Sequence, residues 1–203
     1  MAWYVAPCLV RRRTALDIRW PNRDRRSDGT IGDADHAARI SDHNPDAKGC
    51  VHARDTDKDG IHVPTAIAAG LLHASVTYVI HNRRIFTRGN KFRPSAYTGV
   101  NPHTGHIHVS IGYSATAENS ADVWHPIRPI GLADNVKLGS LGYPVRLVQA
   151  LLNGQGASLQ VDGNAGPRTV AEIRAFQSWA GLAVDGIAGP KTYAALCART
   201  RPW

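Results

Sequence analysis

This 203-residue chain has little cysteine and no long apolar run. Its three cysteines, Cys8, Cys50 and Cys197, are odd in number and far apart, which excludes a disulfide framework and favours buried thiols. We do not expect Cys50 to act as a nucleophile beside His52, because adjacent side chains of a strand point to opposite faces. No stretch approaches the ~20 apolar residues of a membrane span. The apolar N-terminal residues precede the charged run 11–13, the reverse of a secretory signal, so we expect no signal peptide and no membrane insertion.

Acidic residues are also scarce relative to basic ones, with 16 Asp and Glu against 24 Lys and Arg and a formal charge of +8. The excess is shared by both halves, and it favours a polyanionic partner such as nucleic acid or a bacterial wall. The basic clusters 11–13 and 23–26 lack interleaved aromatic residues, and no zinc-finger, helix-turn-helix or ribonucleoprotein motif accompanies them. We interpret both clusters as solvated helix or loop faces and expect no nucleic-acid binding.

Histidine is absent from the C-terminal part of the chain. All ten histidines lie between His36 and His125, and three of them fall within residues 101–108. Histidine is the usual titrating and metal-binding side chain near neutral pH, so this distribution favours chemistry over packing. We therefore place any active site in the first part of the chain.

The segment from His106 to Ile111 alternates polar with β-branched residues, which predicts a half-buried strand. His106 and His108 would share one face, with Cα atoms ~6 to 7 Å apart at the usual rise of a strand. Ile107 and Val109 would face the core. The alternative is a pair of solvent-facing histidines on an edge strand.

A second polar cluster occupies residues 41–57, where a turn-rich stretch leads into a short alternating segment over 51–55. His43 lies in the turn and Asp55 ends the expected strand. A catalytic zinc ion commonly takes three protein ligands from His and carboxylate side chains. His43, Asp55 and His108 would supply that set, and His106 would be the base beside a metal-activated water.

Two other metal assignments use the same segment. Asp57 would share a face with Asp55 if the strand continues, so it remains an alternative ligand. Residues 55–60 match the first half of a calcium-binding EF-hand loop, but Ala66 stands where the bidentate Glu belongs, and Pro64 falls inside the loop. A turn leading into a helix that starts at Pro64 is the simpler interpretation.

The pattern Ser-x-His, Ala-x-Asp and His-x-His resembles the zinc peptidases of the group that contains lysostaphin, the D-alanyl-D-alanine peptidases and the hedgehog fold. The spacing of the last three histidines is particularly similar to the penicillin-insensitive murein endopeptidases. The resemblance implies zinc on His43, Asp55 and His108. It also implies a catalytic role for His106 and a supporting one for His103, with Ser41 and Arg39 contacting the substrate. The twelve-residue separation of His43 and Asp55 is about twice that usual in the family, so residues 44–49 would be an inserted loop.

The end of the chain contains an internal duplication. Residues 159–169 recur as 182–192, with eight of eleven positions identical. Each copy has an Asp-Gly turn followed by Gly-Pro at an expected helix start, and residues 144–152 supply a further short helix. The region from 136 to 198 resembles the peptidoglycan-binding domain type 1. We expect most of the repeated residues to build turns and helix caps.

The sequence thus predicts an α+β protein with two domains. Residues 1–135 would form a small antiparallel sheet with flanking helices, with a linker from about 114. Residues 136–203 would form three helices. A wall peptidase joined to a wall-binding module without a signal peptide resembles a phage endolysin. It would be made in the host cytoplasm, act on peptidoglycan and be a monomer. A bacterial wall-remodelling peptidase and a non-catalytic wall-binding protein are the alternatives.

Overall fold

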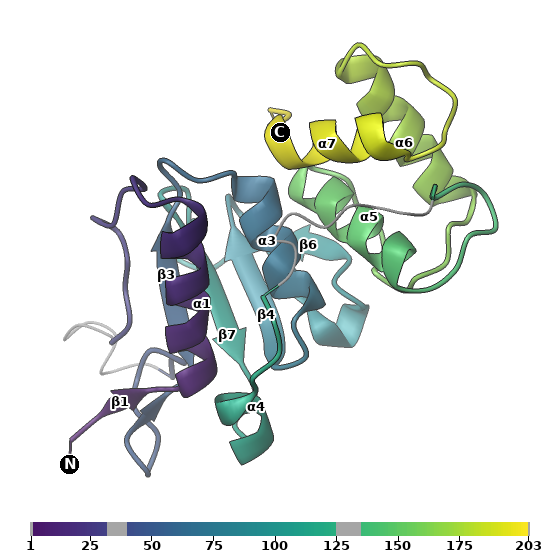
Figure 1. The fold of residues 1–203 in the computed structure, drawn as a ribbon. Helices are drawn as coiled ribbons and strands as arrows, with labels where there is room; N and C mark the ends of the chain where they lie inside the picture. The colour runs from purple at the N-terminus through teal and green to yellow at the C-terminus, as the bar shows by residue number, and fades with distance from the viewer. Residues whose placement is uncertain (1, 32–39, 125–134, 203) are drawn as a thin grey trace.

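The computed structural model describes residues 2–31, 40–124 and 135–202, and it has the α+β organisation predicted from the sequence (Figure 1). The elements are, in order, β1 (Tyr4–Val5), α1 (Pro7–Arg19), β2 (Cys50–Val51), β3 (Ala53–Asp57), α3 (Val63–Leu72), β4 (Val76–His81), β5 (Arg84–Thr87), the 3₁₀ turn η1 (Arg88–Asn90), β6 (Pro94–Ala96), β7 (His106–Ile111), α4 (Ala115–Asn119), α5 (Tyr143–Gly154), α6 (Pro167–Trp179) and α7 (Pro190–Ala198). The antiparallel sheet and the three C-terminal helices confirm the predicted fold class.

Five strands form the main sheet in the order β3-β7-β4-β5-β6, and each neighbouring pair is antiparallel. β7 covers the predicted range 106–111 and lies between β3 and β4, so the edge-strand alternative is wrong. Its pairing with β3 sets Asp55 opposite His108 and Asp57 opposite His106. The segment expected over 51–55 is divided between β3 and β2, and β2 pairs with β1 in a separate parallel ribbon.

The two faces of β7 have different environments because its side chains alternate. Ile107, Val109 and Ile111 are fully buried on the side that packs against α3. Helix and sheet approach closely there, since a Cβ at Gly70 would lie 2.8 Å from a methyl carbon of Val79 on β4. The polar residues of β7 occupy the opposite face, which leaves them available for a site.

The basic clusters near the N-terminus are not simply solvated. Arg12 on α1 is fully buried and donates a hydrogen bond to the Thr56 hydroxyl on β3. Arg23 is only 3% exposed, and its guanidinium contacts the carboxylates of Asp17 and Asp28 at 2.7 Å each. The interpretation of both clusters as solvated faces is therefore wrong for these two arginines. Arg12 thus reaches a buried hydroxyl on β3, and Arg23 pairs with two partly buried carboxylates.

In the C-terminal region, a buried glutamine holds each copy of the repeat. The amide nitrogen of Gln149 donates to Asp162 Oδ1 at 2.9 Å and to the carbonyl of Asn164 at 3.0 Å, while its oxygen accepts from the amide of Gly163 at 2.9 Å. Prolines then start α6 and α7, as the Gly-Pro dipeptides predict.

Gln177 repeats this arrangement in the second copy. It donates to Asp185 Oδ1 at 2.7 Å and to the carbonyl of Ile187 at 3.0 Å, and it accepts from the amide of Gly186 at 2.9 Å. Each loop is therefore closed by a glutamine from the preceding helix, which lies outside the repeated segment itself.

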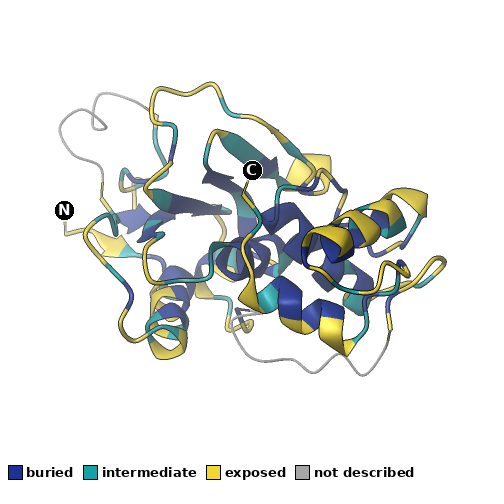
Figure 2. Cartoon of the chain, turned by 90° about the horizontal axis from the view of Figure 1, so that it is seen from above, coloured by how far each residue is buried: buried dark blue, intermediate teal, exposed yellow. Residues whose placement is uncertain are grey.

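The C-terminal helices pack directly against the sheet region, with α5 lying along α3 (Figure 1). The approach requires a glycine, because a Cβ at Gly154 would lie 2.7 Å from the backbone of Pro64. The amide of Val161 also donates to the carbonyl of Lys91 at 2.8 Å. Buried segments therefore continue from the sheet through α3 into α5 (Figure 2).

The proposed boundary near residue 135 stays a prediction. The segment that starts at 114 begins with the short helix α4, and residues 125–134 of the expected linker lie outside the described residues. Within the described ranges, no helix has the length and apolar character that crossing a membrane requires.

Candidate metal centre

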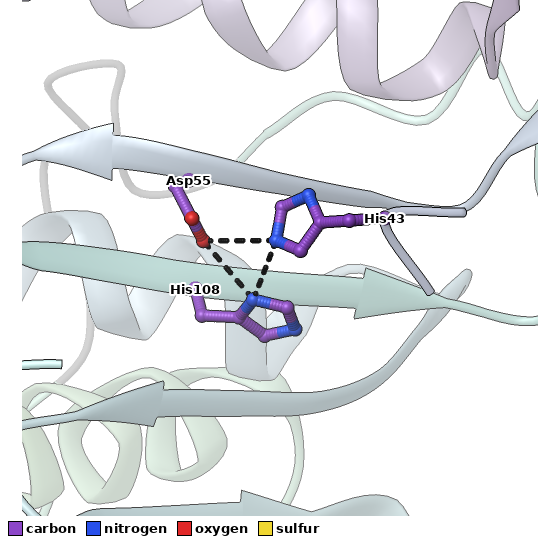
Figure 3. A group of neighbouring side chains, drawn as sticks. All are labelled: His43, Asp55 and His108. Atoms are coloured by element: carbon purple, nitrogen blue, oxygen red, sulfur yellow. Dashed lines mark hydrogen bonds and ion pairs between the residues drawn. The ribbon is translucent and has the colours of Figure 1, made fainter. Parts of the chain in front are cut away.

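Three predicted ligands converge from separate segments onto one point above the sheet (Figure 3). Asp55 comes from β3 and His108 from the facing position of β7, while His43 reaches over from the turn before β2. Asp55 Oδ1 lies 3.0 Å from His108 Nδ1 and 3.3 Å from His43 Nε2, and the two ring nitrogens are 3.1 Å apart. The cluster is largely enclosed, with both imidazoles less than a tenth exposed.

The outer ring nitrogen of His43 fixes its tautomer. His43 Nδ1 lies 3.0 Å from the carbonyl oxygen of Thr30. Because a carbonyl only accepts, Nδ1 must carry the proton in this bond. In the neutral ring, Nε2 then presents a lone pair to the cluster.

A longer chain of hydrogen bonds fixes the tautomer of His108. His108 Nε2 lies 2.8 Å from the hydroxyl oxygen of Ser110. Burial opposes ionisation of Asp42, but that hydroxyl, together with those of Tyr113 and Tyr78, stabilises the carboxylate and lowers the Asp42 pKa. The carboxylate only accepts, so Ser110 donates to Asp42 and receives the proton of Nε2. Tyr78 also donates to Asp42, at 2.8 Å. His108 Nδ1 therefore turns a lone pair toward Asp55, in the manner of an outer partner that orients a metal ligand.

The cluster thus brings together two ring lone pairs and a carboxylate oxygen. Burial opposes ionisation of Asp55, but its close contacts with His108 and His43 outweigh burial and hold the Asp55 pKa far below its usual range, so the carboxylate is ionised. The three acceptor atoms, two ring nitrogens and one carboxylate oxygen, repel one another. A proton can bridge only two of them, whereas a cation placed between them attracts all three. A tetrahedral zinc ion with bonds of about 2.0 to 2.1 Å separates its ligand atoms by about 3.3 Å, close to the observed spacing. These residues fit a metal ion with nitrogen and oxygen ligands.

His106 and His103 border the same point. His106 Nε2 lies 3.5 Å from Asp55 Oδ2 and is buried without a hydrogen-bond partner among the described residues. The ring of His103 lies edge-on to His106, with centroids 4.9 Å apart, and its Nδ1 donates to the carbonyl of Asn101 at 2.7 Å. Burial, together with the neighbouring His108 and His106, lowers the His103 pKa to about 4, so this ring is neutral near pH 7.

A cleft of about 210 Å³ opens beside the cluster. Ser41 lines it, and the Ser41 hydroxyl accepts a hydrogen bond from the His43 amide at 3.3 Å. Ile40 and Val100 line its mouth and are strongly exposed, at 107% and 88%. Arg39, the other predicted substrate contact, lies outside the described residues. The cleft offers apolar and polar surface to a chain next to the metal cluster.

Asp57 does not join the cluster, although it lies on β3 as expected. Its carboxylate accepts hydrogen bonds from the amide and hydroxyl of Ser27, at 2.9 and 2.8 Å, and from the amide of Asp59 at 2.9 Å. With its oxygens engaged in these contacts, Asp57 fixes the turn after β3. The geometry favours Asp55 over Asp57 as the ligand.

Several supporting residues were missed in the sequence. Ser110 could have been found, because it follows His108 by two positions and must share its face. Thr30 acts through its backbone, Tyr78 comes from β4, and Asp42, although it is next to His43 in the sequence, acts on the His108 side of the cluster, so no local pattern identifies these roles.

The argument that separated Cys50 from His52 is wrong. The two residues are two positions apart, so an extended chain brings them to the same side. The structure groups them with Glu118 from α4, and all three are buried. Cys50 is nevertheless a buried thiol, as expected.

Comparison with known proteins identifies the C-terminal part. The model of the family described as "Putative peptidoglycan binding domain" matches residues 142–196, which span α5, α6 and most of α7. The chain therefore carries a C-terminal peptidoglycan-binding domain. No curated protein sequence matches the chain.

Two solved structures are similar in part. A Burkholderia AP3 phage endolysin shares 41% identity over 34% of this chain and 27% of its own, with a TM-score of 0.32. The match thus spans about a quarter of that endolysin. A peptidoglycan-binding protein from Clostridioides difficile, solved with glutamine hydroxamate, shares 16% identity over 61% of this chain and 92% of its own, with a TM-score of 0.36.

Proposed function

We propose that this protein is a zinc-dependent peptidase that hydrolyses a peptide bond in the stem or cross-link of bacterial peptidoglycan. One observation carries the proposal: two imidazole rings, each oriented by an outer contact, and a carboxylate oxygen meet within 3.3 Å beside a cleft. Two histidines and a carboxylate are a ligand set found in catalytic zinc sites of peptidases. The C-terminal peptidoglycan-binding domain supports the wall as the substrate.

In this proposal His43, Asp55 and His108 hold the zinc ion. Zinc in such a site supplies Lewis acidity, which activates water and polarises a substrate carbonyl. His106 transfers the proton, because its buried Nε2 faces the cluster and has no hydrogen-bond partner among the described residues. His103, neutral and packed against His106, orients that ring or the substrate.

Substrate binding is divided between the two regions. Ser41 and Arg39 are the proposed contacts beside the cleft. The C-terminal domain would raise the effective concentration of the peptidase at the wall. The net charge of +8 suits a surface that carries carboxylates and phosphates. We assign this combination to a phage endolysin that is made in the host cytoplasm and degrades the host wall.

The test is to incubate the purified protein with isolated peptidoglycan and to identify the newly freed amino and carboxyl termini by mass spectrometry. We expect paired peptide termini at one bond type, one zinc ion per cleft, and loss of activity with a chelator that zinc restores. Activity that persists in the chelated protein would refute the zinc mechanism.

The same assay separates the alternatives. A non-catalytic wall-binding protein would sediment with peptidoglycan and free no termini. A wall-remodelling enzyme would trim termini without lysing intact cells exposed to it from outside, whereas an endolysin would clear a suspension of wall-exposed cells.

A further inference from the structure

A second group of metal-ligating side chains lies outside the cleft. Cys50 on β2, His52 just before β3 and Glu118 on α4 each offer one ligand atom, and these atoms all lie within 4.8 Å of one another. Cys50 and His52 are fully buried, and Glu118 is 8% exposed. None of the three lines the cleft beside His43, Asp55 and His108.

Only one of the two ring nitrogens of His52 has a polar contact among the described residues. His52 Nε2 lies 3.0 Å from Glu118 Oε1, while His52 Nδ1 is buried and has no hydrogen-bond partner among the described residues. The ring of Tyr113 stacks over His52 at 4.0 Å and covers it from one side. Because Nε2 is the nitrogen that faces Glu118, it is the ring atom that would bind an ion shared with the carboxylate, whereas Nδ1 points away from Glu118 and calls for an ordered water.

The charges in the group also favour a cation. Glu118 places a carboxylate in the interior beside the His52 ring, and a buried charge is costly unless an opposite charge offsets it. The Cys50 thiol has a weak contact with the carbonyl of Val51, at 3.9 Å. A divalent cation that displaced the thiol proton would be neutralised by the thiolate and the carboxylate together, with the imidazole as a neutral third ligand.

We propose that Cys50, His52 and Glu118 form a second, structural metal site that ties α4 to the strand preceding β3. Sulfur, nitrogen and oxygen ligands together suit zinc or a similar borderline divalent ion rather than calcium or magnesium. Binding forms a metal–sulfur bond and releases the thiol proton to solvent, with no change of oxidation state. The enclosed position assigns the ion a role in stability rather than in turnover.

The experiment measures metal content and cobalt spectra of the full chain. Metal-depleted protein is loaded with Co²⁺, and thiolate ligation is recognised by a sulfur-to-cobalt charge-transfer band in the near ultraviolet. We expect two bound ions per chain and this band in the wild-type protein. The proposed catalytic ligands include no sulfur, so the band reports on the second site alone.

Variants separate the two sites. Cys50→Ser should bind one ion fewer and lose the band, whereas Cys8→Ser, which changes another fully buried thiol, should keep both ions and the band. His108→Ala should lose the cleft ion and keep the band, so failure of the zinc peptidase proposal would leave this one standing. Glu118→Gln provides a second probe if Cys50→Ser does not fold.

Stability gives an independent measurement. A chelator should lower the melting temperature of the wild-type protein and of His108→Ala, because an ion bound only to the folded state stabilises it. A wild-type protein without the charge-transfer band when saturated with Co²⁺ would overturn the proposal, and so would an unchanged metal count in folded Cys50→Ser.

Discussion

The sheet region and the C-terminal helices use their polar residues in opposite ways. In the helical region, Gln149 and Gln177 close two equivalent loops, and the amide groups that they bury are hydrogen bonded. Above the sheet, by contrast, the lone pairs of His43 and His108 point at the same carboxylate. The buried glutamines thus make contacts that complete the fold. The histidine cluster instead leaves acceptor atoms facing one another, an arrangement that suits a bound cation.

The largest test of this contrast separates His106 from His108. In His106→Ala, we expect hydrolysis to fall by roughly 10²- to 10⁴-fold, the usual loss for a general acid or base, with the bound metal retained. His108→Ala should lose both metal and turnover. Metal content and the rate of freed termini measure the two effects. His62→Gln, which changes a histidine that bonds Thr65 and the Arg199 carbonyl instead, is the control and should keep both. Equal metal loss in the first two variants would make His106 a ligand.

The glutamines should behave as structural residues. Gln149→Ala and Gln177→Ala each remove several buried hydrogen bonds and leave loop amides unpaired, which should cost about 3 kcal/mol of unfolding free energy in either case. Denaturant titration measures this cost, and exposed Gln160→Ala is the matched control. Hydrolysis of a small soluble peptide by the folded fraction should be unchanged. A large loss of turnover without a loss of stability would break the contrast between the regions.

Ser110 tests whether outer contacts prepare the cluster. Ser110→Ala removes the hydroxyl that joins His108 Nε2 to Asp42, and the loss of such a partner typically weakens metal binding by about 10- to 100-fold. Competition with a chelator of known affinity measures the change. Ser95→Ala, on the exposed strand β6, should bind metal like the wild type. If both variants bind equally well, Ser110 does not orient His108.

Local patterns predicted the parts of this structure that depend on short sequence spacing. The period of two over 106–111 identified β7 and the shared face of His106 and His108, and the Gly-Pro dipeptides located the starts of α6 and α7. The match to the peptidoglycan-binding family confirms the interpretation of the duplicated region.

Those local patterns could not predict contacts between segments that are distant in the sequence. β4, β5 and β6 were not predicted, and so the central position of β7 could not be recognised. The burial of Arg12 depends on how α1 lies over β3, and the role of Asp42 depends on its meeting with Ser110. Such pairings are set by tertiary packing, which overrides local preference.

The smallest expected effect concerns His73, a buried histidine of the sheet region that lies outside the metal cluster. It is 2% exposed, stacks on Trp124, and accepts a hydrogen bond at Nδ1 from the Ser75 amide. Burial lowers its pKa from the ordinary 6.5 to about 4. The unfolded chain therefore binds the proton first, so the free energy of unfolding should fall as the pH drops from about 6.5 toward 4. His73→Gln should remove that part of the decline. Urea titrations of both proteins at pH 7 and pH 5 measure it, and identical declines would mean that His73 takes up its proton without disturbing the fold.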